Sequence, residues 1–137
     1  MRLLACREHS RSELRRKLMC RVQNPELIET VLNTLEASNA LSDRRFAEAY
    51  IDSRVGRGFG PLRIQAELLE KGLNTELAAR CLDARDFRWE RLLQQTAARR
   101  FGPKPARERR EQASRARFLE YRGFAPAHIR RYIWPNG

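Results

Sequence analysis

Residues 60–82 read GPLRIQAELLEKGLNTELAARCL, which predicts two short helices joined by a tight turn. Gly60-Pro61 puts proline at the first helical position, where its missing N–H is not needed. Gly72 ends this helix, because glycine readily takes the left-handed conformation found just past a helix C-terminus. Asn74 then caps the next helix, since its side chain accepts a hydrogen bond from a free backbone N–H. The apolar side chains that recur at helical spacing are Ile64, Leu68, Leu77 and Leu82.

This pattern occurs three times in the chain, at shifts of 50 and 51 positions without a gap. A period of this size is typical of helical repeat proteins, in which each unit buries its apolar face against its neighbours. We therefore expect an all-α fold, an elongated tandem array of three three-helix repeats. Such an array offers a long binding surface more readily than a catalytic pocket. The matched pairs are Leu18 with Leu68, Asn24 with Asn74, Leu68 with Leu119, Gly72 with Gly123 and Leu82 with Ile133.

The three expected repeats cover residues 1–41, 42–85 and 86–137. The first is truncated, because residues 1–8 resemble the end of a helix whose start is missing. No stretch alternates with period two for long, which leaves no room for a sheet. The helix after Asn24 has an apolar stripe made of Leu27, Ile28, Val31, Leu32 and Leu35. Helices are expected to begin after Ser10, Asn24, Ser42, Gly60 and Asn74, near Phe87 and Ala106, and at Pro126.

The positive charge is concentrated in the last third of the chain. There are 28 Lys and Arg against 17 Asp and Glu, a net charge of +11, and 25 of the 28 are arginine. The net charge is +2 for residues 1–41, +1 for residues 42–85 and +8 for residues 86–137. A basic patch attracts phosphate backbones or an acidic protein surface, and arginine suits flat, bidentate contacts with either. A genome that favours arginine codons explains the arginine excess equally well, but not its position.

Residues 106–117 are expected to form an arginine-rich helix in the third repeat. Steps of three and four residues put Arg107, Arg110 and Arg117 on one face with Ser114, while Arg109 and Arg115 lie elsewhere around the helix. This face is a candidate site for phosphate or for an acidic partner. The alternative is a solvated surface on which Glu108 and Glu111 screen the arginines.

The spacing of cysteine, histidine and carboxylate side chains argues against a metal or catalytic site. Cys6, Cys20 and Cys81 form an odd set without a CxxC pair, so we interpret them as reduced side chains of a cytosolic protein. His9 and His128 have no metal-ligand spacing and no evident catalytic partner. Carboxylates are scattered, and no phosphate-binding loop motif occurs. We therefore expect no metal, no cofactor and no enzyme such as a nuclease.

No apolar run reaches the length that a membrane span requires, and the N-terminus lacks the apolar core of a signal peptide. These features predict a cytoplasmic protein without a membrane partner.

Several ordered motifs resemble the RecX family of regulatory proteins. Residues 41–50, LSDRRFAEAY, resemble its pattern L-x-D-x-R-F-A-x-x-Y. Residues 58–73 resemble G-x-G-P-x-R-I followed by E-L-x-x-K-G-I, and residues 7–18 resemble R-x-H-S-x-x-E-L-x-x-K-L. Residues 118–131 resemble the third repeat of the family. The resemblance covers essentially the whole chain, and ordered motifs at the right spacing are far more specific than one alone.

The resemblance implies tandem three-helix repeats and a regulator that is not an enzyme. Members of the family bind along the groove of the RecA filament on single-stranded DNA. There they inhibit strand exchange, ATP hydrolysis and the co-protease activity that triggers the SOS response. The expected partner is therefore the RecA filament, in DNA repair and recombination. Separately, the largely balanced charge of the first two repeats leads us to expect a monomer. One departure is that this chain begins inside the first repeat's opening helix, where family members usually have more residues.

The candidate site residues form two groups. Residues expected to contact RecA or DNA are Arg45, Arg63, Arg107, Arg110, Arg117, Arg130 and Arg131. Pairing with acids of neighbouring repeats stays open as the alternative for Arg45, Arg63, Arg130 and Arg131. Signature residues expected to be structural are Asp43, Phe46, Tyr50, Gly60, Pro61, Ile64, Leu68 and Gly72.

A stand-alone DNA-binding protein is the other hypothesis, because three short helices per unit are similar to helix-turn-helix modules. Direct base readout needs exposed Arg, Asn or Gln at the N-terminal end of a recognition helix. The third helices, 74–84 and 126–133, offer little of that. Non-specific binding of single- or double-stranded DNA through the basic third repeat stays open.

Overall fold

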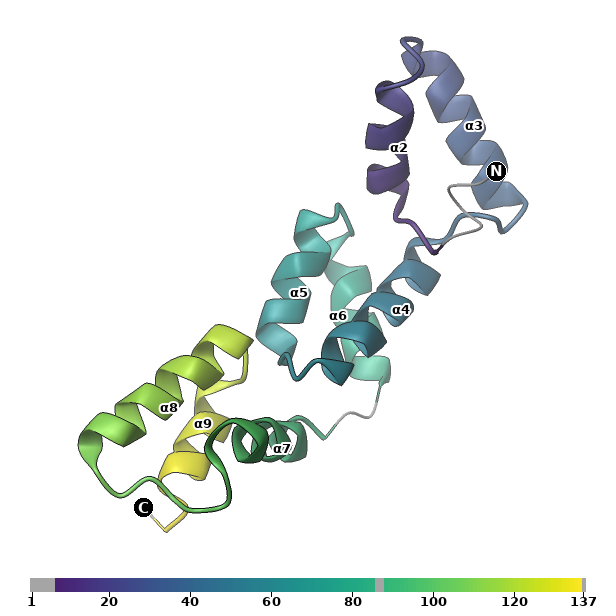
Figure 1. Ribbon diagram of the computed structural model, residues 1–137. Coiled ribbons are helices and arrows are strands. Elements are labelled where there is room, and N and C mark those ends of the chain that lie inside the picture. The colour runs from purple at the N-terminus through teal and green to yellow at the C-terminus, as the bar shows by residue number, and fades with distance from the viewer. Residues whose placement is uncertain (1–6, 86–87, 137) are drawn as a thin grey trace. The chain divides into compact units, whose positions relative to one another are not determined.

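The computed structural model describes residues 7–85 and 88–136, and every regular element in these ranges is a helix (Figure 1). The all-α fold class is therefore confirmed. Arg7 and Glu8 are not helical, and the rest of the helix end expected at residues 1–8 lies outside the described residues. The helices are α2 (Arg11–Met19), α3 (Pro25–Ala37), α4 (Asp43–Gly56), α5 (Pro61–Glu70), α6 (Thr75–Ala84), α7 (Trp89–Phe101), α8 (Arg109–Arg122) and α9 (Pro126–Ile133).

Four of these helices begin at the capping side chains that the sequence predicts. The Ser10 hydroxyl accepts from Glu13 N at 3.0 Å, and the Asn24 side chain accepts from Leu27 N at 3.2 Å. The hydroxyl of Ser42 accepts from Arg45 N at 3.2 Å, and Asn74 accepts from Glu76 N at 2.8 Å. Each cap satisfies an N–H group that has no partner inside its helix.

One predicted boundary is wrong. Helix α8 begins at Arg109, three residues after the predicted start near Ala106. Residues 102–108 instead form an irregular loop, in which the backbone of Lys104 accepts from Arg115 and that of Ala106 accepts from Gln112. The start of α7 near Phe87 falls outside the described residues, and the described helix begins at Trp89.

The chain forms two compact units, each built from two separate segments. Unit 1 combines the described part of residues 1–51 with residues 67–83, and unit 2 combines residues 52–66 with the described part of residues 84–137. Helices α4 and α5 thus contribute to both units.

In unit 1, α2 and α3 lie side by side and bury a small apolar cluster. The segment 67–83 adds the buried side chains of Leu68 and Leu82. Tyr50 is half-buried, and its hydroxyl donates to Glu67 Oε1 at 3.0 Å. The buried side chains of the cluster between α2 and α3 are Leu14, Ile28, Leu32 and Leu41.

In unit 2, helices α7, α8 and α9 pack around one apolar core. Ile64 of α5 is also fully buried. Two aromatic rings close the core beside the α7–α8 loop, since Phe101 and Phe118 meet edge to face with centroids 5.4 Å apart. The buried core side chains are Leu93, Ala97, Leu119, Phe124, Ile129 and Ile133.

Candidate binding surface

Unit 2 carries a continuous row of alternating arginine and aromatic side chains, which we call the arginine–aromatic ladder. Each guanidinium lies over a neighbouring ring at a distance suited to cation–π attraction. The successive distances from guanidinium carbon to ring centroid are 5.1 Å for Arg100–Phe118, 5.0 Å for Phe118–Arg122, 4.6 Å for Arg122–Phe59, 4.5 Å for Phe59–Arg63 and 4.6 Å for Arg63–Tyr121.

The ladder depends on a close junction between the start of α5 and the end of α8. Gly60 N donates to Arg122 O at 2.7 Å, and Leu62 N donates to Gly123 O at 2.9 Å. Two N–H groups at the start of one helix thus meet two carbonyls at the end of another, so that these four terminal groups are satisfied. Gly123 has φ +91°, and a Cβ there would lie 2.5 Å from Arg63 N, so this position requires glycine.

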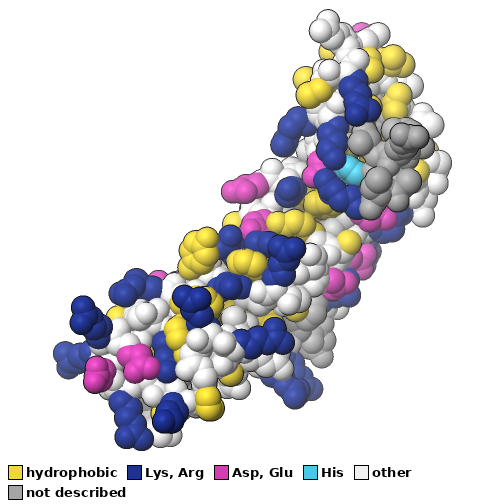
Figure 2. All heavy atoms as spheres, in the orientation of Figure 1, with side chains coloured by type: hydrophobic (Ala, Val, Ile, Leu, Met, Phe, Trp, Pro, Cys, Tyr) yellow, Lys and Arg dark blue, Asp and Glu magenta, His cyan; other side chains and the backbone are white. Residues whose placement is uncertain are grey.

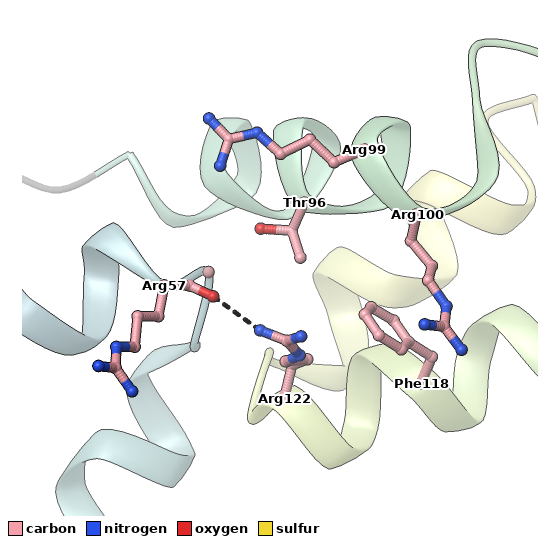
Figure 3. Close-up of a pocket in the computed structure, with 7 residues that line it drawn as sticks. Arg57, Thr96, Arg99, Arg100, Phe118 and Arg122 are labelled. Atoms are coloured by element: carbon pink, nitrogen blue, oxygen red, sulfur yellow. Dashed lines mark hydrogen bonds between the residues drawn. The ribbon is translucent and has the colours of Figure 1, made fainter.

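A pocket of about 220 Å³ lies beside the ladder (Figure 3). Its walls come from the turn after α4, from α7 and from α8. The Arg122 guanidinium crosses the middle of this site and donates to Arg57 O at 2.7 Å. We call it the arginine pocket, and its lining residues are Arg57, Gly58, Thr96, Arg99, Arg100, Phe118 and Arg122.

The arginine pocket has an unbalanced charge. Four of its lining side chains are cationic and none is acidic. Arg57, Arg99 and Arg100 are exposed, and among the described residues their side chains form no ion pair. Figure 2 shows Lys and Arg side chains interspersed with apolar ones on the visible face. Such a site attracts anions, because its positive charges are not neutralised from within.

Arg115 is the exception among the arginines of α8, because it is buried (3% exposed). It donates to Lys104 O and to Tyr132 Oη, both at 2.9 Å, and to Glu111 Oε1 at 2.6 Å. Burial lowers the pKa of Arg115, but its hydrogen bonds to Tyr132 and Glu111 outweigh that effect, and the pKa is raised above its ordinary value. Arg115 therefore remains a cation that ties the α7–α8 loop to α8 and α9.

Most of the predicted contact arginines lie in unit 2. Arg110 and Arg117 are exposed on α8, two turns apart, and Arg130 is exposed on α9. Among the described residues these three have no ion-pair partner, since Glu111 pairs with Arg115. Arg131 pairs with Glu90 at 2.7 Å.

Two other predicted contact residues have surroundings that the sequence did not indicate. Arg107 lies in the loop before α8, beside a hollow of about 520 Å³ next to Lys104. The prediction that Arg107 shares a helical face with Arg110 and Arg117 is therefore wrong. Arg63 belongs to the ladder and also donates to Tyr121 O at 3.1 Å.

Arg45 is the one predicted contact residue in unit 1. Its side chain donates to Glu8 Oε1 at 3.0 Å and to Asn39 Oδ1 at 2.9 Å, so pairing with nearby polar groups occupies it. The neighbouring signature residue Asp43 accepts from Arg11 N at 2.7 Å. Its carboxylate therefore holds the first N–H of α2 in addition to starting α4.

The other signature residues occupy the core and the helix ends. Phe46, Ile64 and Leu68 are buried. Gly60-Pro61 begins α5 at the junction with α8, and Gly72 follows the C-terminus of α5 with φ +89°. A Cβ on Gly72 would collide with Ser12, so Gly72 lies close against the start of α2.

Spacing in the sequence did not reveal the ladder, because its members come from three separate segments. Phe59 lies in the turn before α5, Arg100 on α7, and Tyr121 and Arg122 on α8. The one available signal was the density of arginine beside aromatic residues at 57–63 and 117–122.

Among residues 7–85 and 88–136, no cluster has the three or more His, Cys, Asp or Glu side chains that a metal site needs. No described helix is both long enough and apolar enough to cross a membrane.

Sequence comparisons identify similar proteins along the whole chain. A family model described as "RecX, second three-helix domain" matches residues 42–82. A protein of Chromohalobacter salexigens named "Regulatory protein RecX" is 40% identical, with 99% of this chain and 91% of that protein covered. Proteins of the same name from Pseudomonas fluorescens and Pseudomonas syringae pv. tomato are 40% and 39% identical, covering 97% and 100% of this chain and 86% and 88% of those proteins.

Solved structures with the same fold are also known. The crystal structure of RecX from Lactobacillus salivarius has a TM-score of 0.82 at 22% identity, covering 98% of this chain and 89% of that one. A second structure, described as regulatory protein RecX, has a TM-score of 0.80 at 22% identity, covering 98% of this chain and 67% of that one.

Proposed function

Because the chain belongs to the RecX family of regulatory proteins, we propose that it binds the filament of RecA on single-stranded DNA. By binding there it inhibits strand exchange, ATP hydrolysis and co-protease activity, and so modulates DNA repair and the SOS response. The observation that carries this proposal is about 40% identity over nearly the full length of both this chain and its relatives.

The surface of unit 2 supports this role on physical grounds. A partner that contains DNA is anionic, and the arginines of unit 2 present unneutralised positive charge. Several weak contacts on one compact unit raise the effective concentration of each for the next, so binding needs no deep pocket. We propose that Arg107, Arg110, Arg117 and Arg130 contact the filament, and that the protein acts as a non-enzymatic monomer in the cytoplasm.

The test is hydrolysis of ATP by a bacterial RecA on single-stranded DNA, followed while this protein is added in substoichiometric amounts. Inhibition well below one copy per RecA is expected if the protein caps filaments or promotes cooperative disassembly. Inhibition that requires about one copy per RecA indicates coating of the groove. No inhibition at saturating amounts contradicts the proposed function.

Non-specific DNA binding without RecA is the second candidate, favoured by the four arginines of the arginine pocket. Comparing the affinity for RecA-coated and bare single-stranded DNA separates the two. Equal affinities favour the second candidate.

A further inference from the structure

We propose that the arginine pocket and the arginine–aromatic ladder together form a binding site for a single-stranded nucleic acid. A backbone phosphate occupies the pocket, and an unstacked base lies on Tyr121 at the other end of the ladder. The biological use of this site depends on the proposed function, but its affinity for a bare oligonucleotide does not.

The first argument is charge. Arg57, Arg99, Arg100 and Arg122 line one pocket of about 220 Å³ without an acidic side chain. Cations gathered in this way repel one another, and an anion in the pocket relieves that repulsion. A phosphodiester fits this chemistry, because guanidinium groups donate paired hydrogen bonds to phosphate oxygens.

The second argument is preorganisation of the central arginine. Arg122 is held by its hydrogen bond to Arg57 O at 2.7 Å and lies against the rings of Phe59 and Phe118. Its side chain is already ordered, so a ligand need not immobilise it on binding. The two rings beside this guanidinium also displace water from it, which strengthens its attraction for an anion.

The third argument concerns the base. Tyr121 is 70% exposed, although Arg63 lies 4.6 Å from its ring centroid. A ring that is held in place on one side and open on the other is a suitable stacking platform for a nucleobase. Bases in a duplex are already stacked, so this platform favours a single strand. Alternating phosphate donors and rings are typical of proteins that bind single strands without reading their sequence.

The pocket is tested by removing two of its exposed cations from the full chain. The Arg99→Ala/Arg100→Ala variant should bind a fluorescein-labelled oligothymidylate roughly tenfold more weakly in anisotropy titrations. The slope of log affinity against log salt should fall by roughly 0.7 for each phosphate that the variant no longer neutralises. The control is Arg88→Ala/Arg91→Ala, which removes the same charge from exposed positions at the start of α7.

The comparison between these two variants decides the matter. The site is supported if only the pocket variant loses affinity for oligothymidylate, while its circular dichroism spectrum and melting temperature match those of the control. Equal affinities and equal salt slopes for the two variants overturn it.

The stacking platform is tested at Tyr121. Tyr121→Ser should weaken oligothymidylate binding roughly tenfold with an unchanged salt slope, and Tyr121→Phe should bind normally. Trp134→Ser is the control, because Trp134 is an exposed aromatic of unit 2 outside the ladder (51% exposed). Equal binding by the Tyr121→Ser and Trp134→Ser variants overturns the placement of a base on Tyr121.

Competition with the labelled oligothymidylate tests which phosphate compound binds the pocket and whether an acidic protein segment binds there instead. Unlabelled oligothymidylate should displace the probe, while inorganic phosphate, ATP and oligoglutamate at matched ionic strength should not. Displacement by inorganic phosphate or ATP at comparable concentrations assigns the pocket to a free phosphate and overturns the proposal. Displacement by oligoglutamate that depends on Arg99 and Arg100 assigns the arginine pocket to an acidic protein segment. This result also overturns the proposal.

The RecA assay separates this inference from the proposed function. A wild-type protein that binds oligothymidylate through the pocket but never inhibits RecA contradicts the proposed function alone. A pocket variant with undiminished affinity for DNA, in a protein that does inhibit RecA, contradicts the nucleic-acid site alone.

Discussion

Arg115 shows how one residue organises the surface around it. Its guanidinium is buried, yet it reaches the α7–α8 loop through Lys104 O and α9 through the Tyr132 hydroxyl. A buried cation is costly unless hydrogen bonds compensate for its lost hydration. Here the Glu111 carboxylate supplies the compensating negative charge at 2.6 Å.

We expect Arg115→Met to lower the free energy of unfolding by about 3 kcal/mol, because Lys104 O and the Tyr132 hydroxyl lose their donor. The matched control is Arg117→Met on the same helix, which is exposed and should change stability by no more than about 0.5 kcal/mol. Urea denaturation measures both. Similar stabilities for the two variants would mean that Arg115 does not anchor the loop.

His9 is a second residue whose surroundings oppose its charge. Its ring is buried, Nε2 lies 3.0 Å from Lys17 Nζ, and Nδ1 lies 3.1 Å from Arg7 O. Burial and the nearby charges of Lys17 and Arg7 lower the pKa of His9 below its ordinary value of 6.5, although the bond to Arg7 O and the charge of Glu13 oppose this. The neutral ring donates from Nδ1 to Arg7 O and accepts from Lys17.

This lowered pKa predicts a pH dependence of stability. Between the folded pKa and 6.5 the unfolded chain binds a proton that the folded protein does not, so stability falls as the pH drops through that window and then levels off. Melting temperatures measured from pH 7 to pH 5 should show this decline. This fall in melting temperature should be smaller in the His9→Gln variant and unchanged in the His128→Gln variant. A decline of equal size in both variants excludes His9 as its source.

At the scale of elements, one junction occurs in each unit. In unit 2 the end of α8 at Gly123 meets the start of α5, and in unit 1 the end of α5 at Gly72 meets the start of α2. In unit 1 the Ser10 hydroxyl donates to Lys71 O at 2.9 Å. The corresponding donor in unit 2 is Gly60 N, which donates to Arg122 O. The sequence repeat pairs Gly72 with Gly123, so equivalent positions form both junctions, although the donor is a side-chain hydroxyl in unit 1 and a backbone N–H in unit 2.

We expect Gly123→Ala to destabilise the protein by clearly more than the roughly 1 kcal/mol that a left-handed alanine costs, because its Cβ would also collide with Arg63. Gly56→Ala is the control, since Gly56 has no positive φ and an added Cβ there meets open space. A loss at Gly123 that exceeds the control by clearly more than about 1 kcal/mol measures the collision at the junction. An excess of only about 1 kcal/mol would mean that the close contact with Arg63 relaxes without cost.

Local signals in the sequence predicted the elements well. The caps at Ser10, Asn24, Ser42 and Asn74 depend on neighbouring residues alone, and all four form as expected. The apolar stripe of α3 was predicted less well. Leu27 is 49% exposed, because packing against α2 covers only one side of that helix.

The candidate site could not be predicted to the same extent. Arg115 has the same residue type as its exposed neighbours, and only packing against Lys104 and Tyr132 makes it structural. The ladder joins segments far apart in the chain. The α5–α8 junction that aligns these segments does not appear as a periodic pattern in the amino-acid sequence. Long-range contacts of this kind are decided by tertiary packing.

At the scale of the whole molecule, the uneven charge distribution predicts which end binds DNA-containing partners. Arg107→Glu/Arg110→Glu/Arg117→Glu should weaken binding to the RecA filament and flatten its salt dependence. The control is Arg16→Glu/Arg44→Glu/Arg80→Glu, three exposed arginines of unit 1. Each arginine-to-glutamate change removes two positive charges, so both variants fall from +11 to +5. Equal losses in filament pull-down assays would make net charge, not position, the cause.

The division of α5 between the two units affects how the protein is made. As the chain leaves the ribosome, residues 67–83 meet unit 1 segments that are already synthesised, whereas residues 52–66 belong with segments still to come. The N–H groups of Gly60 and Leu62 stay hydrated until Arg122 and Gly123 emerge. The second half of α5 therefore has native partners before its first half does. Synthesis of nearly the entire chain must precede assembly of the proposed nucleic-acid site, so a prematurely released chain lacks it.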